Sequence, residues 1–356
     1  MTRYLLAGGG TAGHVNPLLA LADAIKDQAG EQQVWALGTI EGLESRLVPE
    51  RGIKLLTVDR LPMPRKLNAY AFSFPFRFAK AIRVVKQYIV DYKIDVVVGF
   101  GGYASAPAYR AAKALRIPYV VHEANALPGY ANKVGARNAS AVAITFSNTK
   151  LPNAKLTGLP LREEIVELTK TDHRFEANQF FGLDPKLTTL LVTGGSLGAK
   201  KINETIEESR TILEAAGVQV IHIVGDRAGL ADESVGGYRR ISYCSRMELA
   251  IAAADFAVAR SGAATVSEFS AVGLPAIFVP YPVGNGEQRL NAEAVVAVGG
   301  ARIVLDEDFT PEFVSSTLIP LLSNKKVILE MQEKSRSVGI VTGSQDLLKL
   351  VNGVLF

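Results

Sequence analysis

The chain has 356 residues, of which 48% are hydrophobic and 21% are charged, and its formal net charge is +4. A length of this order predicts about two domains, each large enough to bury its own core. The composition excludes a disordered chain, and so small a positive charge does not by itself predict nucleic-acid binding.

Neither of the two long uncharged runs predicts a membrane segment. Glycines interrupt the first run, 4–22, so it lacks the continuous apolar stretch of a signal peptide. The second run, 269–286, contains prolines that exclude a spanning helix. The single cysteine, Cys244, excludes an internal disulfide and is consistent with a reducing cytosol.

The first half of the chain alternates apolar runs with helical segments. Strands are predicted at 4–7, 33–36, 54–58, 96–98, 119–121 and 141–144. This α/β alternation predicts a parallel sheet with helices on both faces, in which ligands bind beyond the carboxyl ends of the strands. Polar or glycine-rich loops follow three of these strands and are expected to converge on one edge of the sheet: 8–14, 99–105 and 122–125.

The first of these loops matches a dinucleotide-binding fingerprint in its spacing, Gly8-x-Gly10-x-x-Gly13. That fingerprint also needs an acidic residue after the second strand to bind a ribose, and Leu37-Gly38-Thr39 stands there instead. The sequence therefore disfavours a nicotinamide-dependent oxidoreductase.

After a linker at 158–162 the pattern restarts. Strands are predicted at 188–192, 218–224, 256–259 and 276–279, and the first of them ends in a glycine turn at 194–199. A last helix, 342–355, is expected to cross back onto the first domain. We therefore expect domains at 1–158 and 159–338, with a C-terminal helical segment at 339–356.

The stretch 260–291 carries groups that suit a nucleotide sugar. A tight turn at Ser261-Gly262 precedes a predicted helix, whose free N–H groups and positive dipole end suit a phosphate. Glu268 lies one turn into that helix, where a carboxylate can accept ribose hydroxyls. Gln288 and Asn291, at i and i+3 on the next helix, can bind sugar hydroxyls together. The alternative for this stretch is an ordinary α/β turn with solvated polar side chains.

Five motifs follow one another along the chain: Gly-Gly-Thr-x-Gly-His at 9–14, Gly-Gly-Tyr-x-Ser-x-Pro at 101–107, His-Glu-x-Asn at 122–125, Gly-Gly-Ser at 194–196 and Arg-Ser-Gly-Ala-x-Thr-x-Ser-Glu at 260–268. In this order and spacing they resemble those of the bacterial N-acetylglucosaminyltransferases of peptidoglycan synthesis, which have the GT-B fold and belong to glycosyltransferase family 28. The resemblance implies two Rossmann-like parallel-sheet domains that face a central cleft.

The resemblance also implies the reaction and the site. N-acetylglucosamine would pass, with inversion, from UDP-N-acetylglucosamine to the muramoyl-pentapeptide of an undecaprenyl-pyrophosphoryl carrier. Donor contacts would come from Thr11, Ala12, Gly13, Asn125, Arg162, Ser196, the backbone around Cys244, Ala263, Ala264, Thr265, Glu268, Gln288 and Asn291. The acceptor would lie against Gly9, Gly10, Gly101, Gly102 and Tyr103. Departures from the family pattern, such as Leu197 in place of glutamine, put single contacts in doubt.

His14 is the candidate catalytic residue. It follows a glycine turn at the expected carboxyl edge of the first sheet, and histidine titrates near neutral pH, as a base for the acceptor hydroxyl must. The alternative is that its imidazole only binds a phosphate or a backbone group. The sequence shows no clustered metal ligands, so we expect no metal and no cofactor.

The segment 60–93 combines basic and aromatic residues. Phe78, Ile82, Val85 and Ile89 follow helical spacing and are expected to face the core, whereas the aromatic residues of 70–76 are expected in a loop and first turn. Aromatic residues ringed by Lys and Arg suit docking on an anionic lipid surface, so we expect Tyr70–Lys86 to hold the protein on the cytoplasmic face of the plasma membrane. The alternative is that these aromatic residues cap the sheet.

The prediction is therefore a membrane-peripheral, inverting glycosyltransferase that does not bind nucleic acid. Another GT-B transferase with a different lipid or small-molecule acceptor would share the donor motifs but not Gly101–Pro107. A non-catalytic two-domain binding protein would have no need of His14.

Overall fold

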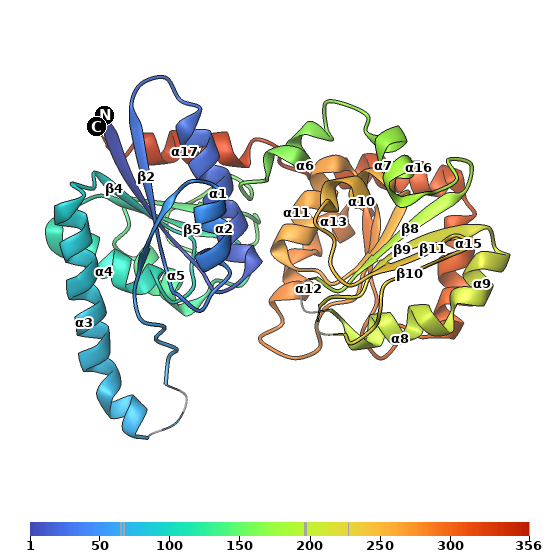
Figure 1. Cartoon of the computed structure of the whole chain (residues 1–356), viewed down its shortest axis with the longest axis horizontal. Helices are drawn as coiled ribbons and strands as arrows, with labels where there is room; N and C mark the ends of the chain where they lie inside the picture. Colours follow the sequence, from blue (N-terminus) through green and yellow to red (C-terminus); the bar gives the residue numbers. More distant parts are fainter. Residues whose placement is uncertain (65, 67, 196–197, 227, 356) are drawn as a thin grey trace. The chain divides into compact units, whose positions relative to one another are not determined.

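The computed structural model describes residues 1–64, 66, 68–195, 198–226 and 228–355. The chain forms two compact units: Met1–Arg162 with Thr342–Phe356, and Glu163–Val341. Each unit is built on a seven-stranded sheet (Figure 1). The predicted α/β class is confirmed, and so is each of the strands predicted in the two halves.

The sheet of the first unit is parallel throughout, in the order β3-β2-β1-β4-β5-β6-β7. Its strands are β1 (Thr2–Ala7), β2 (Gln32–Gly38), β3 (Lys54–Thr57), β4 (Val96–Gly99), β5 (Tyr119–Glu123), β6 (Ala141–Ile144) and β7 (Ala154–Leu156). Its helices are α1 (Ala12–Lys26), α2 (Glu44–Glu50), α3 (Ala69–Asp91), α4 (Ser105–Leu115), α5 (Tyr130–Ala136) and α17 (Gly343–Asn352).

Successive residues of the central strand β1 supply two separate cores. Leu6 packs with Leu18 and Val15 of α1 on one face, and Leu5 packs with Val85 of α3 and residues of α4 on the other. Because side chains alternate across a strand, a stretch of strand buried on both faces is an unbroken apolar run, as Tyr4–Ala7 of β1 is.

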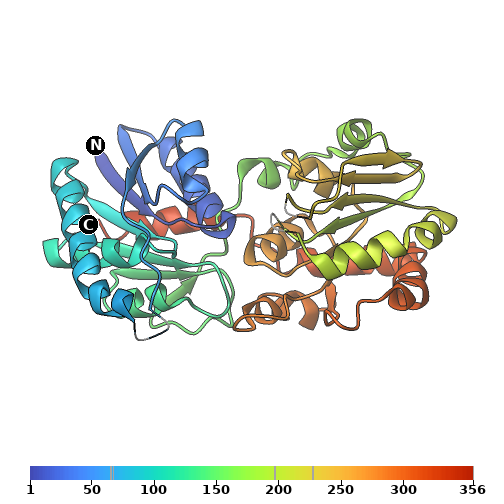
Figure 2. The ribbon, with the colours of Figure 1, turned by 60° about the horizontal axis from the view of Figure 1, so that its bottom comes forward.

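The C-terminal helix α17 belongs to the first unit. Leu347 and Val351 are buried in the same core as α1, and the Tyr4 hydroxyl donates to the Asn352 side chain at 3.0 Å. Figures 1 and 2 both show this red helix beside the blue helix α1.

Helix α3 differs from the prediction for its segment. It begins at Ala69 and so includes all the aromatic residues that we expected in a loop and first turn. Phe78, predicted to face the core, is only half-buried and stacks on Phe74 at 5.8 Å, whereas Val85 is fully buried. Phe72 and Phe76, one turn apart, are 73% and 80% exposed. The first turns of α3 therefore extend beyond the core and present aromatic rings to solvent.

In the second unit the sheet order is β10-β11-β9-β8-β12-β13-β14, and only the β10–β11 pair is antiparallel. The strands are β8 (Thr188–Thr193), β9 (Val218–Ile223), β10 (Glu233–Val235), β11 (Tyr238–Ile241), β12 (Phe256–Ala259), β13 (Ala276–Phe278) and β14 (Ala301–Ile303). The helices are α6 (Glu163–Glu167), α7 (Arg174–Phe181), α8 (Lys200–Glu208), α9 (Arg210–Ala215), α10 (Met247–Ala253), α11 (Ala263–Val272), α12 (Glu287–Asn291), α13 (Glu293–Ala297), α14 (Pro311–Phe313), α15 (Ile319–Leu322) and α16 (Lys325–Arg336), with a π-helical turn at Val314–Leu318 between α14 and α15.

Candidate active site

Each sheet has one point at which the chain reverses its direction of strand addition. In the first unit that point lies between β1 and β4, and in the second it lies between β8 and β12. Parallel sheets bind ligands in the crevice outside the carboxyl ends of such a strand pair. The glycine loops singled out in the sequence, 8–14 with 99–105 and 194–199 with 260–262, follow these four strands.

In the first unit the two loops touch through their backbones. A Cβ atom on Gly102, whose φ is +78°, would lie 2.5 Å from the Gly9 carbonyl oxygen. The Ser105 hydroxyl oxygen lies 2.9 Å from the Ala7 carbonyl and accepts a hydrogen bond from the Gly101 N–H at 3.0 Å. Larger residues at 102 would therefore separate the two loops, which explains the glycine there.

His14 lies in the first turn of α1 and is half-buried between these loops. Its Nδ1 is 3.1 Å from the Gly9 carbonyl oxygen and 3.4 Å from the Thr11 hydroxyl. A carbonyl only accepts, so in the neutral ring the proton resides on Nδ1 and the lone pair on Nε2. Nε2 faces Gly101, where an added Cβ would lie 3.1 Å from it. The arrangement therefore leaves Nε2 as a proton acceptor beside Gly101, between the two glycine loops.

Glu44 of α2, which the sequence analysis did not predict as a site residue, binds the backbone of the first glycine loop. Its buried carboxylate accepts hydrogen bonds from the Gly10 N–H at 2.8 Å, the Thr39 N–H at 2.8 Å and the Thr39 hydroxyl at 2.9 Å. A Cβ atom on Gly9, Gly38 or Gly42 would overlap the Glu44 side chain. In the sequence these glycines were the only signal for Glu44, because a glycine indicates that another group comes close to the backbone but not which group.

The loop after β5 is braced by a second buried carboxylate. Glu123 accepts from the Asn125 N–H at 2.9 Å, the Gly129 N–H at 3.0 Å and the Asn132 amide at 2.8 Å. Asn125, predicted to contact the donor, is thus fixed at the carboxyl edge of the sheet. Burial lowers the pKa of the neighbouring His122 to about 4, so this ring is neutral at physiological pH and has a structural role.

In the second unit, α11 begins at Ala263 with Gly262 as its N-cap. Ala263, Ala264 and Thr265 form its first turn, so their N–H groups are among those that a helix leaves without intrahelical partners. Glu268 lies one turn further along and is 8% exposed. Of the other predicted phosphate contacts, Ser196 lies outside the described residues, and the half-buried Arg162 ends the first unit.

Gln288 and Asn291 both lie on α12, as predicted, but in different surroundings. The Gln288 side chain is half-buried and its Oε1 accepts from the Tyr281 N–H at 2.9 Å. Asn291 is 1% exposed, and its amide donates to the Ser261 carbonyl at 3.1 Å. This contact braces α12 against the turn before α11, and the sugar contact predicted for Asn291 stays a prediction.

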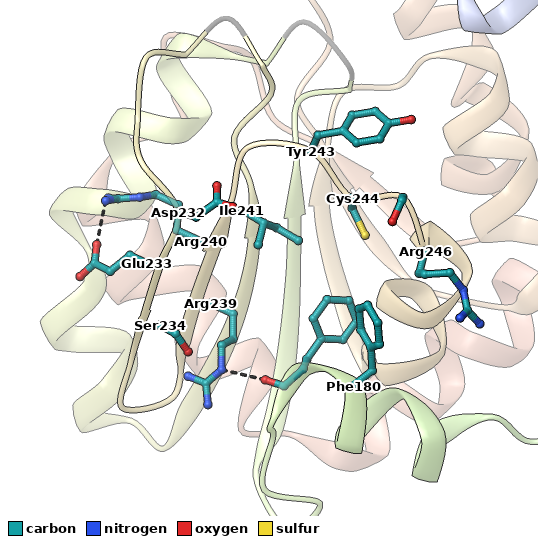
Figure 3. Close-up of a pocket in the computed structure, with 12 residues that line it drawn as sticks. Phe180, Asp232, Glu233, Ser234, Arg239, Arg240, Ile241, Tyr243, Cys244 and Arg246 are labelled. Carbon is teal, nitrogen blue, oxygen red and sulfur yellow. Dashed lines mark hydrogen bonds and ion pairs between the residues drawn. The ribbon is translucent and has the colours of Figure 1, made fainter. Parts of the chain in front are cut away.

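Cys244 is half-buried on the loop between β11 and α10 and lines a cavity of about 470 Å³ (Figure 3). Phe180 of α7 lies on one side of this cavity, and Arg239 donates to the Phe181 carbonyl at 2.7 Å. Arg240 pairs with Glu233 at 2.8 Å and so ties the two short strands β10 and β11 together.

Among the described residues, no group of three or more His, Cys, Asp or Glu side chains is placed to hold a metal ion. Within those same parts of the chain, no helix combines the length and apolar character needed to cross a membrane.

Two family descriptions match this chain: the glycosyltransferase family 28 N-terminal domain over residues 4–144, and the C-terminal domain of the same family over residues 189–351. A protein from Leifsonia xyli is 52% identical over 99% of this chain and 98% of its own length, and one from Streptomyces coelicolor is 48% identical over 94% and 93%. Both are called UDP-N-acetylglucosamine–N-acetylmuramyl-(pentapeptide) pyrophosphoryl-undecaprenol N-acetylglucosamine transferase.

Among solved structures, Acinetobacter baumannii MurG aligns with a TM-score of 0.78 at 29% identity, over 99% of this chain and all of that one. A UDP-GlcNAc 2-epimerase from Neisseria meningitidis, bound to UDP-GlcNAc, aligns with a TM-score of 0.70 at 13% identity over 99% of this chain and all of its own, which shows a shared fold. These likenesses and the two parallel-sheet units confirm the predicted GT-B class.

Proposed function

This chain belongs to glycosyltransferase family 28, and we propose that it transfers N-acetylglucosamine from UDP-N-acetylglucosamine to the muramoyl-pentapeptide of a pyrophosphoryl-undecaprenol carrier. The named relatives match it over nearly its whole length. Its product would be the disaccharide precursor of peptidoglycan.

The observation that carries the chemistry is the orientation of His14. With Nδ1 committed to the Gly9 carbonyl, Nε2 takes the proton of the acceptor hydroxyl as that oxygen attacks the anomeric carbon. The bond from the anomeric carbon to the β-phosphate oxygen breaks in the same displacement, and UDP leaves with the electron pair. Glu123 is a weaker candidate for the base, because both of its oxygens already bind backbone or amide donors.

We propose that the donor-binding site lies at the carboxyl edge of the sheet in the second unit. The first turn of α11 stabilises the charge of the departing diphosphate with backbone N–H groups, without a metal. Glu268 accepts the ribose hydroxyls, Gln288 the sugar hydroxyls, and the backbone around Cys244 reads the uracil. The contacts predicted for Arg162, Ser196, Asn125 and the Thr11–Gly13 turn stay predictions.

The acceptor side follows the first unit's glycine loops. We place the acceptor pyrophosphate and sugar against Gly9, Gly10, Gly101, Gly102 and Tyr103. We also propose that the first turns of α3 rest on an anionic membrane surface at its cytoplasmic face, because Phe72 and Phe76 expose apolar rings beside basic residues of the same helix.

One assay tests the reaction. UDP release from UDP-N-acetylglucosamine is measured with and without a lipid-linked muramoyl-pentapeptide acceptor, and we expect release to depend on that acceptor. Transfer to an unrelated lipid, with none to the muramoyl acceptor, would contradict the proposal.

A second experiment tests the base. His14→Ala is expected to lower kcat by about two to four orders of magnitude and to change UDP-sugar affinity little. If His14 only binds phosphate, the acceptor KM rises instead and kcat at saturation barely changes. A pH–rate limb that survives in His14→Ala would also reject this residue as the base.

A further inference from the structure

A single peptide group links Glu44 to His14. The Gly10 N–H donates to Oε2 of Glu44 at 2.8 Å, and the Gly9 carbonyl accepts from Nδ1 of His14 at 3.1 Å. Those two groups are the two ends of one planar peptide unit. A buried carboxylate, a peptide and the imidazole therefore form one chain of hydrogen bonds.

The carboxylate end of this chain is held rigidly. The other oxygen of Glu44 accepts both Thr39 donors, and the side chain is fully buried. Glycine at positions 9, 38 and 42 leaves room for the Glu44 side chain, since a Cβ at each position would lie between 2.1 and 2.4 Å from a Glu44 atom. Three glycines make room for this one carboxylate and three hydrogen-bond donors hold it, which indicates a role beyond packing.

We propose that Glu44 is a positioning residue, which acts through the Gly9–Gly10 peptide to fix the tautomer of His14 and to stabilise the imidazolium formed when Nε2 takes a proton. The inference rests on the proposed function of His14. Hydrogen bonds in a chain polarise one another, so a carboxylate on the peptide N–H makes the peptide carbonyl a better acceptor for Nδ1–H. The Thr11 hydroxyl, at 3.4 Å, is the longer and more exposed contact of Nδ1.

The neighbouring histidine, His122 of β5, does not supply this effect. Burial lowers the pKa of His122 to about 4, so it is neutral throughout the range in which a surface-accessible histidine titrates.

The test is the pH titration of the His14 ring by NMR, which needs neither substrate nor turnover. Glu44→Gln keeps the side-chain volume and removes the charge, and we expect the His14 midpoint to fall below that of the unaltered protein. Glu50→Gln, on the same helix but exposed, is the matched control and is expected to leave the midpoint unchanged. An unchanged midpoint in Glu44→Gln overturns the inference.

Kinetics provide the second readout. Glu44→Gln is expected to lower kcat about tenfold to a hundredfold, with less than a threefold change in acceptor KM, and to add nothing in a His14→Ala background. A loss of the same size in that background would mean that Glu44 only supports the loop, and would overturn the inference. If the unaltered protein transfers no sugar at all, the proposed function fails, while the titration still decides the link between Glu44 and His14.

Folding of each variant is read from the emission of Trp35, the single tryptophan, which lies on β2 of the same unit. Should Glu44→Gln not fold, Glu44→Asp decides instead, since shortening the side chain draws the carboxylate away from the Gly10 N–H. A His14 midpoint that stays unchanged in this variant also overturns the inference.

Discussion

Replacing Phe72 and Phe76 with Ser should detach the protein from anionic vesicles without unfolding it. The structure refines which rings to remove: Phe74 stacks on Phe78 and is half-buried, whereas Phe72 and Phe76 are 73% and 80% exposed one turn apart. Since these two rings bury little surface in the folded chain, their removal should cost about 0.5 kcal/mol of stability or less.

The magnitude follows from the exposed area. Full burial of a Phe side chain is worth about 1.5–3 kcal/mol, and three-quarters of each ring is available. Two rings entering the interface therefore supply at most about 2–4.5 kcal/mol, which corresponds to a loss of roughly thirtyfold to two-thousandfold in vesicle binding. Exposed basic residues of α3, such as Arg77, add about 1 kcal/mol each near an anionic surface, and salt screens this part.

The assay is sedimentation with vesicles that contain anionic lipid, at low and high salt. Phe175→Ser is the matched control, because Phe175 is 75% exposed but lies on α7 of the second unit. Activity on a short-chain soluble acceptor should survive in the double variant. If Phe175→Ser reduces sedimentation as much as the double variant does, or if the double variant sediments normally, α3 is not the membrane-binding surface.

Three further predictions concern the two units separately. Glu268→Ala should weaken the binding of UDP and of UDP-N-acetylglucosamine alike, by about 1.5–3 kcal/mol, whereas Gln288→Ala should weaken only the binding of UDP-N-acetylglucosamine. Equal effects of Gln288→Ala on the binding of both ligands, measured by calorimetry, would reject its sugar contact. Burial lowers the pKa of His222 from 6.5 to about 4, so the unfolded chain binds the proton first. The free energy of unfolding should therefore fall as pH drops from about 6.5 to 4, by up to about 1.4 kcal/mol per pH unit. Measured by urea unfolding, this pH dependence should be weaker in His222→Gln, and an unaltered pH dependence would count against the effect of His222. The Cβ of Gly102→Ala would lie 2.5 Å from the Gly9 carbonyl oxygen, so this variant should destabilise the first unit by about 1–3 kcal/mol. Unfolding followed by Trp35 emission measures the change, and an unfolding midpoint equal to that of the unaltered protein would show that the two loops separate without a free-energy cost.

The strands that are easiest to predict are the central ones buried on both faces. Val96–Gly99 and Phe256–Ala259 are fully buried and read as unbroken apolar runs, which is the pattern of a central parallel strand. The strands that were not predicted are short and lie at a sheet edge or next to one: β7 and β14 have three residues each, and the β10–β11 hairpin carries Arg239 and Arg240. Packing against a neighbouring strand, rather than local composition, makes these segments extended.

The start of α3 shows a different limit. The aromatic residues of 70–76 were expected in a loop and first turn, yet the helix begins at Ala69, where the Asn68 side chain accepts from the Ala71 N–H at 3.0 Å, and it contains Pro75. A cap and the long amphipathic segment that follows outweigh one proline, whose missing N–H removes a single helical hydrogen bond.

The glycine loop shows why a residue such as Glu44 escapes sequence reasoning. A search for a partner of His14 looks for a carboxylate on the same loop, and that loop has none. The structure brings the carboxylate from α2, and its contact with the loop is to a backbone N–H, which every residue except proline carries. The only trace in the sequence is therefore the glycines at 9, 38 and 42, which lie on separate segments and acquire a common reason only once the Glu44 side chain is seen among them. Gly9, Gly38 and Gly42 lack a positive φ, so the close approach of the Glu44 side chain, and not a left-handed backbone, accounts for the glycine at each position.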